Sequence, residues 1–83
     1  MVCTANICRS PIAHGLLRHL LDLQGLNQLV AVDSAGTHII QKGLSPDVRA
    51  QQVAGDYGID LSNLRSRNIR QKDFSAYDFI LAM

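Results

Sequence analysis

The sequence predicts an α/β fold in which a parallel sheet is flanked by helices. Two observations carry this prediction. Two short apolar runs, Leu29–Ser34 and Asp78–Met83, have the composition of buried strands. Two further segments have apolar residues that recur at helical spacing. Strands that alternate with helices are typical of a parallel sheet.

The amino-terminal part predicts a strand end, a tight loop and a long helix. Met1 and Val2 are interpreted as the end of a strand. Ser10 is a preferred N-cap and Pro11 suits the first helical position, so a helix is expected to open there. Gly25 is expected to end it. The apolar stripe of this helix, expected in the core, consists of Ile12, Leu16, Leu17, Leu20, Leu21 and Leu23.

The second half predicts one more helix and a polar loop. Ser45 and Pro46 repeat the helix-start signature, and Gly58 is expected to close the helix. The apolar face of this helix is formed by Ala50, Val53, Ala54 and Tyr57. Residues 61–72 are polar and rich in arginine, which predicts a loop with a short helical turn.

Composition restricts the class of protein. The 83 residues, 47% hydrophobic and 18% charged, predict one globular domain over residues 1–83. A net charge of +1 does not indicate binding to nucleic acid or to membrane surfaces. No apolar run is long enough to span a bilayer. Two cysteines five positions apart are poor material for a disulfide scaffold, and no histidine pair completes a metal site. We therefore expect a cytoplasmic protein with free thiols and without a cofactor.

The segment from Cys3 to Arg9 carries the chemistry. It lies between a strand end and a helix start, where free backbone N–H groups and the helix dipole favour an anion. A cysteine there loses its proton readily, and Ser10 can donate its hydroxyl to the thiolate. Arg9 returns beside Cys3 if the loop closes, and its planar fork can hold two phosphate oxygens. The spacing predicts a nucleophile, an amide cradle and a clamp on one phosphate.

The run CTANICRSP at Cys3–Pro11 resembles the active-site loop of the low-molecular-weight protein tyrosine phosphatases. The resemblance continues through DSAGTH (33–38), SPDVRA (45–50), YGIDL (57–61) and DFSAYDFILAM (73–83). It implies a phosphotyrosine protein phosphatase I-like, flavodoxin-like three-layer fold, incomplete here, of which residues 1–83 are the N-terminal and central part. It also implies hydrolysis of phosphotyrosine proteins or small aryl phosphates.

The resemblance assigns roles to individual residues. Cys3 matches the nucleophile that becomes phosphocysteine, and Arg9 matches the arginine that stabilises the transition state. Asn6 matches the asparagine that shapes the loop through a left-handed backbone, and Ser34 matches a serine that supports it. Cys8 matches the second loop cysteine, which can bond the nucleophile on oxidation. The substrate-binding residues are then expected to be Thr4, Ala5, Asn6, Ile7, Cys8, Arg9, Ser10 and Ile40.

Several positions depart from the family pattern. Ala5 replaces a common glycine, which requires a negative φ there. Ile40 stands where many members have an aromatic residue that lines the phosphotyrosine slot. Leu64 and His14 replace a histidine and a glutamate. No aspartate matches the general acid, which in the family follows beyond the equivalent of Met83, so these 83 residues alone are expected to be impaired.

Two other functions remain open. A thiol-dependent arsenate reductase shares this loop and fold, although the wording NICRSP favours the phosphatase. A phosphate-binding module without turnover would need no general acid. Cys8 is either a small packing residue or a redox partner. The three histidines (His14, His19 and His38) and the cluster of Arg65, Arg67 and Arg70 are best explained as solvated positions.

The two ends of the chain lead to one more expectation. Only Met1 and Val2 precede the nucleophile, whereas strands usually run about five to six residues. In the family's sheet the first strand lies between the second and the third. Leu29–Ser34 and Asp78–Met83 would therefore flank a gap with unpaired backbone. We expect the 83 residues to be a marginally stable fragment of a longer catalytic domain.

Overall fold

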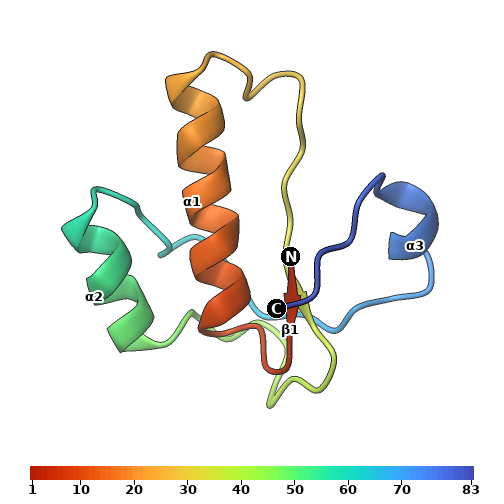
Figure 1. The fold of residues 1–83 in the computed structure, drawn as a ribbon. Coiled ribbons are helices and arrows are strands. Elements are labelled where there is room, and N and C mark those ends of the chain that lie inside the picture. Colours follow the sequence, from red (N-terminus) through yellow and green to blue (C-terminus); the bar gives the residue numbers. More distant parts are fainter.

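The computed structural model describes all residues from 1 to 83. In chain order the elements are β1 (Val2–Cys3), α1 (Arg9–Leu23), β2 (Ala35–Gly36), α2 (Val48–Asp56) and α3 (Asp73–Ala76). Figure 1 shows α1 at the centre, with α2 on one side and α3 on the other. Both chain ends lie near β1, and the nucleophile loop turns from β1 into the start of α1. None of the helices is long and apolar enough to cross a membrane.

The sheet is parallel, as predicted, but it is very short. β1 pairs with β2 in the register Val2 with Ala35 and Cys3 with Gly36. Single parallel bridges join Val2 to Ala82 and Gly36 to Asn68. β1 therefore lies between the chain that follows Ser34 and the chain that ends at Met83. This places the carboxyl end of β1, and with it Cys3, at the edge where the loop begins.

The predicted strands over Leu29–Ser34 and Asp78–Met83 are not formed as such. The first is irregular up to Ala35, and the second contributes only the bridge at Ala82. Leu29 is 80% exposed and Phe79 is 83% exposed, so neither run is buried. The physical reason is that a strand needs a paired backbone, and β1 is too short to pair along either run.

An open cavity of about 710 Å³ separates these two runs. Its lining is largely apolar and includes Leu29, Val30, Val32, Phe79 and Ile80. β1 reaches only one end of the cavity, where the Ala35 N–H donates to the Met1 carbonyl (3.0 Å) and the Val2 N–H donates to the Leu81 carbonyl (2.8 Å). Apolar surface that the sequence assigned to the core is therefore exposed.

Both long helices form, but they start at other residues than predicted. α1 begins at Arg9 with Cys8 as its N-cap and no side-chain cap bond, because the Ser10 hydroxyl is turned inward instead. α2 begins at Val48, and its N-cap is Asp47, whose carboxylate accepts from the Arg49 N–H (3.1 Å), not Ser45. The glycines predicted to end the helices, Gly25 and Gly58, have φ of 68° and 74° after the last turn.

The core is small and lies between α1 and α2. Ala50, Ala54 and Leu61 are fully buried, and Ile12, Ile59 and Leu64 pack around them. Gly15 makes this contact possible, because a Cβ at Gly15 would overlap the Leu61 side chain. The prediction of a leucine core along α1 is wrong in part, since Leu16 is 44% and Leu20 49% exposed. These two leucines are therefore outside the core. Val53 on α2 and Tyr57, the residue after α2, are likewise exposed.

Candidate active site

The nucleophile candidate, Cys3, is the last residue of β1 and is 6% exposed. Its Sγ lies 3.0 Å from the Oγ of Ser10, which is itself fully buried in the first turn of α1. The Asn6 Nδ2 donates a second bond to the same Oγ (2.8 Å). A thiolate can only accept, so once Cys3 loses its proton the Ser10 hydroxyl is the donor of this bond. The serine is thereby set to donate to a thiolate.

Hydrogen bonds lower the pKa of the Cys3 thiol. Burial by itself would raise the pKa of the Cys3 thiol. The Ser10 hydroxyl, the backbone N–H groups of Ser10 and Asn6, and the charge of Arg9 together outweigh burial, so that the pKa lies below its ordinary value. Arg9 is exposed at the first position of α1, free to meet a ligand. The site can present a thiolate and a cation to the same anion.

Asn6 fixes the shape of the loop. It has φ 57°, and no other non-glycine residue has a positive φ, which confirms the left-handed backbone predicted for it. Its side chain is 2% exposed and is bonded at both ends: Nδ2 donates to Ser10, and Oδ1 accepts from the Arg67 N–H (3.1 Å). The same observation meets the condition set for Ala5, whose φ is not positive.

Gly36 lets β2 approach the loop closely. A Cβ at Gly36 would lie 2.6 Å from the Thr4 carbonyl oxygen and 3.1 Å from the Ala5 carbonyl carbon. Both are backbone atoms, which cannot rotate away. The Thr37 N–H donates to the Cys3 carbonyl (2.9 Å). The loop is therefore braced from behind by the chain that leaves β2.

The structure corrects two predictions about polar residues next to the loop. Ser34 does not bond Asn6; its Oγ lies 2.9 Å from Nδ1 of His14. His14 is not solvated but 3% exposed, because its position on α1 faces β2. Burial, and after it the charge of Arg18, lowers the pKa of His14 to about 4, against an opposing effect of Asp33. The pair joins α1 to the residue before β2.

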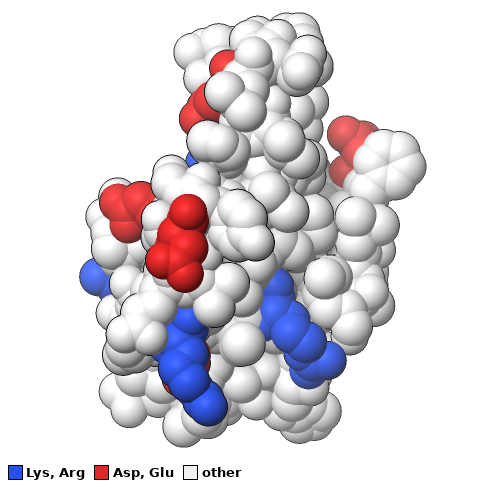
Figure 2. Space-filling view, turned by 60° about the vertical axis from the view of Figure 1, so that its left-hand side comes forward, with Lys and Arg blue, Asp and Glu red and all other residues white.

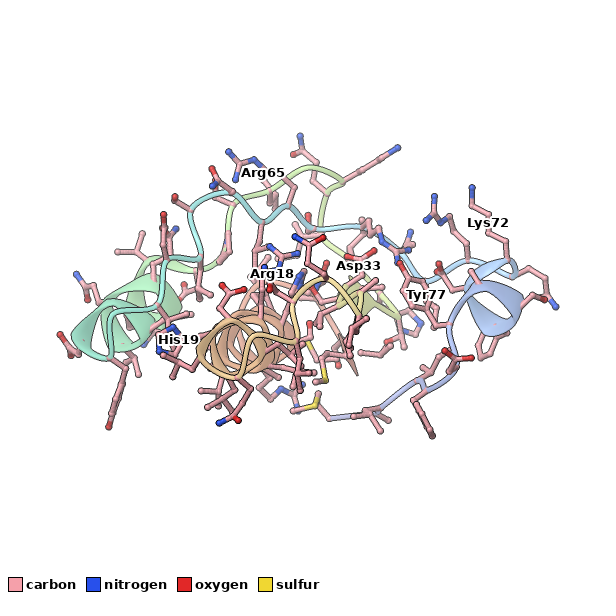
Figure 3. All side chains as sticks on the ribbon, turned by 90° about the horizontal axis from the view of Figure 1, so that it is seen from above. Arg18, His19, Asp33, Arg65, Lys72 and Tyr77 are labelled. Carbon is pink, nitrogen blue, oxygen red and sulfur yellow. The ribbon has the colours of Figure 1, made fainter.

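Arg67 is a residue that sequence reasoning missed, because it was grouped with Arg65 and Arg70 as a solvated face. Its side chain is only 19% exposed and lies between two carboxylates, with Nη2 3.0 Å from Asp33 Oδ2 and Nη1 2.8 Å from Asp73 Oδ2. The Tyr77 hydroxyl donates to the same Asp33 oxygen (3.0 Å). Figure 3 shows Asp33 and Tyr77 directed toward one another, with Arg65 at the outer edge.

Most of the remaining predicted substrate-binding residues are exposed. Thr4 and Cys8 are exposed, and Ile40 is 75% exposed on the segment after β2. Cys3 and Cys8 are both free thiols. No group of three or more metal-ligating side chains is present. Figure 2 shows a face on which charged side chains are scattered among uncharged ones, without a continuous basic patch.

Comparisons with known proteins show the family to which the chain belongs. The family model for low molecular weight phosphotyrosine protein phosphatases matches residues 1–83. A human protein named low molecular weight phosphotyrosine protein phosphatase is 42% identical over 82 residues, which are 99% of this chain and 51% of that one. The chain therefore belongs to the low molecular weight phosphotyrosine protein phosphatase family, as its loop sequence predicted.

Solved structures confirm the fold. YfkJ from Bacillus subtilis matches with a TM-score of 0.95 at 34% identity, over 99% of this chain and 52% of that chain. A structure named drosophila arginine phosphatase matches with a TM-score of 0.92 at 40% identity, over 99% of this chain and 51% of that chain. The fold is the family's three-layer α/β fold, incomplete here. The chain spans about half the length of the curated relatives it matches.

Proposed function

We propose that the chain carries the nucleophile half of a protein tyrosine phosphatase site, which hydrolyses phosphomonoesters through phosphocysteine on Cys3. The observation that carries this proposal is the Cys3 Sγ held 3.0 Å from the Ser10 Oγ at the start of α1. A thiol with a lowered pKa at a helix N-terminus is a nucleophile poised beside an anion site. Family membership and the names of the relatives support it.

The proposed reaction has two displacement steps. In the first, the Cys3 thiolate attacks phosphorus in line, a P–S bond forms, and the P–O bond to the leaving group breaks. In the second, water attacks phosphorus, the P–S bond breaks, and the electron pair returns to sulfur, where the Ser10 hydroxyl stabilises it. The loop amides from Thr4 to Ser10 and the Arg9 guanidinium hold the equatorial oxygens throughout. Water loses a proton to solvent as inorganic phosphate leaves.

The leaving oxygen needs a proton, and neither of the two aspartates that contact Arg67 is suited to supply it. A general acid works best when its pKa is near the operating pH. The Arg67 guanidinium and the Arg70 N–H lower the pKa of Asp73 to about 2, and the pKa of Asp33 is also lowered, despite burial, by its bonds to Ser34 and Arg67. We propose that residues 1–83 are the N-terminal and central part of a catalytic domain, and that by themselves they are impaired by about 10²–10⁴-fold on poor leaving groups.

The test compares substrates and two substitutions. Nitrophenyl phosphate should be hydrolysed far better than a phosphotyrosine peptide, also in the presence of a chelator. Cys3→Ser should abolish turnover and keep phosphate binding, and Arg9→Lys should lose at least about tenfold, because an ammonium lacks the bidentate fork. Arg49→Lys, at an exposed position on α2, is the control. Undiminished hydrolysis by Cys3→Ser would remove Cys3 from the mechanism.

The same assay addresses the substrate class and the rival functions. Ile40 is not aromatic, and one similar structure is named an arginine phosphatase. Phosphoarginine is therefore assayed beside the phosphotyrosine peptide. Faster turnover of phosphoarginine than of any phosphotyrosine peptide would replace the tyrosine assignment. The match to a phosphatase family weighs against arsenate reduction. If the chain binds phosphate but hydrolyses none of the esters, its function would be that of a phosphate-binding module without turnover.

Cys8 is proposed as a redox partner of Cys3, and a reactive free thiol fits a cytoplasmic location. Both cysteines are free, Cys3 buried and Cys8 exposed at the loop's end. Mild peroxide would oxidise Cys3 to a sulfenic acid, which the Cys8 thiol condenses with to form a disulfide and water. Inactivation should be reversed by dithiothreitol in the unmodified chain and not in Cys8→Ala. Equal, irreversible loss in both would remove this role.

A further inference from the structure

We propose that Arg67 is a positioning residue that fixes the proton pattern of the nucleophile loop, and that Asp33 and Asp73 form the clamp that holds it. This rests on the proposed role of Cys3 as nucleophile. Arg67 lies 64 positions away in sequence from Cys3, on a segment with no helix or strand of its own. It joins the buried ion pair to the reactive thiol through hydrogen bonds.

The path from Arg67 to the sulfur is continuous. The Arg67 N–H donates to Asn6 Oδ1 (3.1 Å), Asn6 Nδ2 donates to Ser10 Oγ (2.8 Å), and Ser10 Oγ lies 3.0 Å from Cys3 Sγ. Each bond fixes the direction of the next. Because Asn6 Oδ1 faces a backbone donor, the amide must present its NH₂ group to Ser10. With Asn6 donating to Ser10 Oγ, the Ser10 proton remains available to the sulfur, and a Cys3 thiolate can only accept it. Without the Arg67 N–H, no donor would hold Asn6 Oδ1, and the side-chain amide could turn over.

The Arg67 backbone is held on its other side as well. Its carbonyl accepts from the Gly36 N–H (2.8 Å), and the Ile69 N–H donates to the Gly36 carbonyl (2.9 Å). Gly36 is the residue that braces the loop from behind. The segment around Arg67 is therefore placed between β2 and Asn6, where a small displacement would lengthen the bond to Asn6.

The side chain anchors this segment. Both terminal nitrogens contact Asp73, at 2.8 and 3.3 Å, and Nη2 also contacts Asp33 at 3.0 Å. Asp73 is itself fixed by the Arg70 N–H (2.7 Å), and its carboxylate is 5% exposed. A two-pronged contact of this kind sets direction as well as distance, which an ammonium cannot reproduce. In contrast, Arg65 is exposed and donates only to the carbonyls of Ser62 and Leu64 beside it.

Arg67 acts through these bonds rather than through its charge. The cation that lowers the pKa of the Cys3 thiol is Arg9, and the other favourable contributions are hydrogen bonds from Ser10 and Asn6. The charge of Arg67 is balanced by the two carboxylates beside it. A substitution that keeps this charge but loses the fork should therefore still disturb the thiol.

The test measures the reactivity of Cys3 without turnover. In a Cys8→Ala background, the rate of alkylation by iodoacetamide is measured against pH for the otherwise unmodified chain, for Arg67→Lys and for Arg65→Lys. Alkylation follows the thiolate, so a midpoint raised by about one pH unit slows the reaction about tenfold below the midpoint. We expect Arg67→Lys to slow alkylation about three- to tenfold at pH 6, with native circular dichroism, and Arg65→Lys to leave it unchanged.

A profile for folded Arg67→Lys that coincides with that of the control would overturn the proposal. If Arg67→Lys does not fold, Asp33→Asn decides the question, because it removes one carboxylate and leaves the contact with Asp73. A raised midpoint in Asp33→Asn supports the proposal, and an unchanged one refutes it. Since no substrate is involved, a chain without phosphatase activity would refute the proposed function and still give this result.

Discussion

The two sides of β1 differ in how their side chains are satisfied. Around the loop and the segment at Arg67, buried polar side chains have hydrogen-bond partners: Asn6, Ser10, Ser34, Ser66 and Asp73 each have at least one. On the side of the cavity, apolar residues such as Leu29 and Phe79 are exposed and their backbone is largely unpaired. The candidate site therefore depends on specific hydrogen bonds more than on apolar burial. Only five of the fifteen buried residues are counted as hydrophobic core.

The difference arises because the polar side chains near the loop have their bonding partners within residues 1–83, whereas the two apolar runs lack a strand between them. The bonds around Asn6 join β1, the start of α1 and the segment at Arg67, all of which are present. The two apolar runs at 29–34 and 78–83 need a strand between them, and β1 covers only their last residues. A hydrogen-bonded loop can be complete while the sheet beside it is not.

The largest expected effect comes from removing the close approach behind the loop. Gly36→Ala places a Cβ 2.6 Å from the Thr4 carbonyl oxygen, so the loop backbone must move, and hydrolysis of nitrophenyl phosphate should fall at least about a hundredfold. Gly55→Ala is the matched control, because its Cβ would meet nothing within 4 Å on α2. It should keep activity and gain about 0.5–1 kcal/mol of stability. Equal activity of both variants would show that the loop is not braced by β2.

A second pair of substitutions compares the packed core with the open apolar side. Leu61→Ala should lower the free energy of unfolding by about 2–5 kcal/mol, because Leu61 is 1% exposed and packed against Ala50 and Ala54. Phe79→Ser should change it by no more than about 0.5 kcal/mol, because Phe79 is 83% exposed. Urea unfolding measures both. A large loss in Phe79→Ser would mean that the cavity side is packed in solution.

The smallest expected effect concerns His14 and pH. Its folded pKa of about 4 lies below the ordinary value of 6.5, so the unfolded chain takes up a proton that the folded chain refuses. The stability this group contributes is present above pH 6.5, decreases as pH falls, by at most about 1.4 kcal/mol per pH unit, and is lost once pH reaches about 4. His14→Asn should flatten that window in urea unfolding, whereas His38→Asn, at an exposed position, should not. Parallel curves for all three chains would contradict a buried neutral His14.

Local sequence predicted the loop better than it predicted the sheet. The nucleophile, the left-handed Asn6 and the Ser10 hydroxyl lie within eight residues, so their arrangement depends on one turn and the start of one helix. The same compactness explains the wrong N-cap, because a serine turned toward sulfur cannot also cap α1. At Leu29–Ser34 the apolar composition is typical of a buried strand. It does not indicate whether a neighbouring strand is present to pair with its backbone.

The positions that sequence missed depend on distant partners. Arg67 meets Asp33 across 34 positions and Asn6 across 61, and nothing in the polar run at 61–72 distinguishes it from Arg65. His14 meets Ser34 across 20 positions. Asp33 and Asp73 are the first residues of DSAGTH and DFSAYD, 40 positions apart, and nothing in either run indicates that both contact Arg67.

Trapping the covalent intermediate tests the central claim most directly. The chain is mixed with nitrophenyl phosphate, quenched during turnover and digested, and the peptide that contains Cys3 is analysed by mass spectrometry. We predict one phosphoryl group on Cys3 in the unmodified chain and none in Cys3→Ser. Release of phosphate while Cys3 remains unmodified, or phosphorylation at any other residue, would contradict the account.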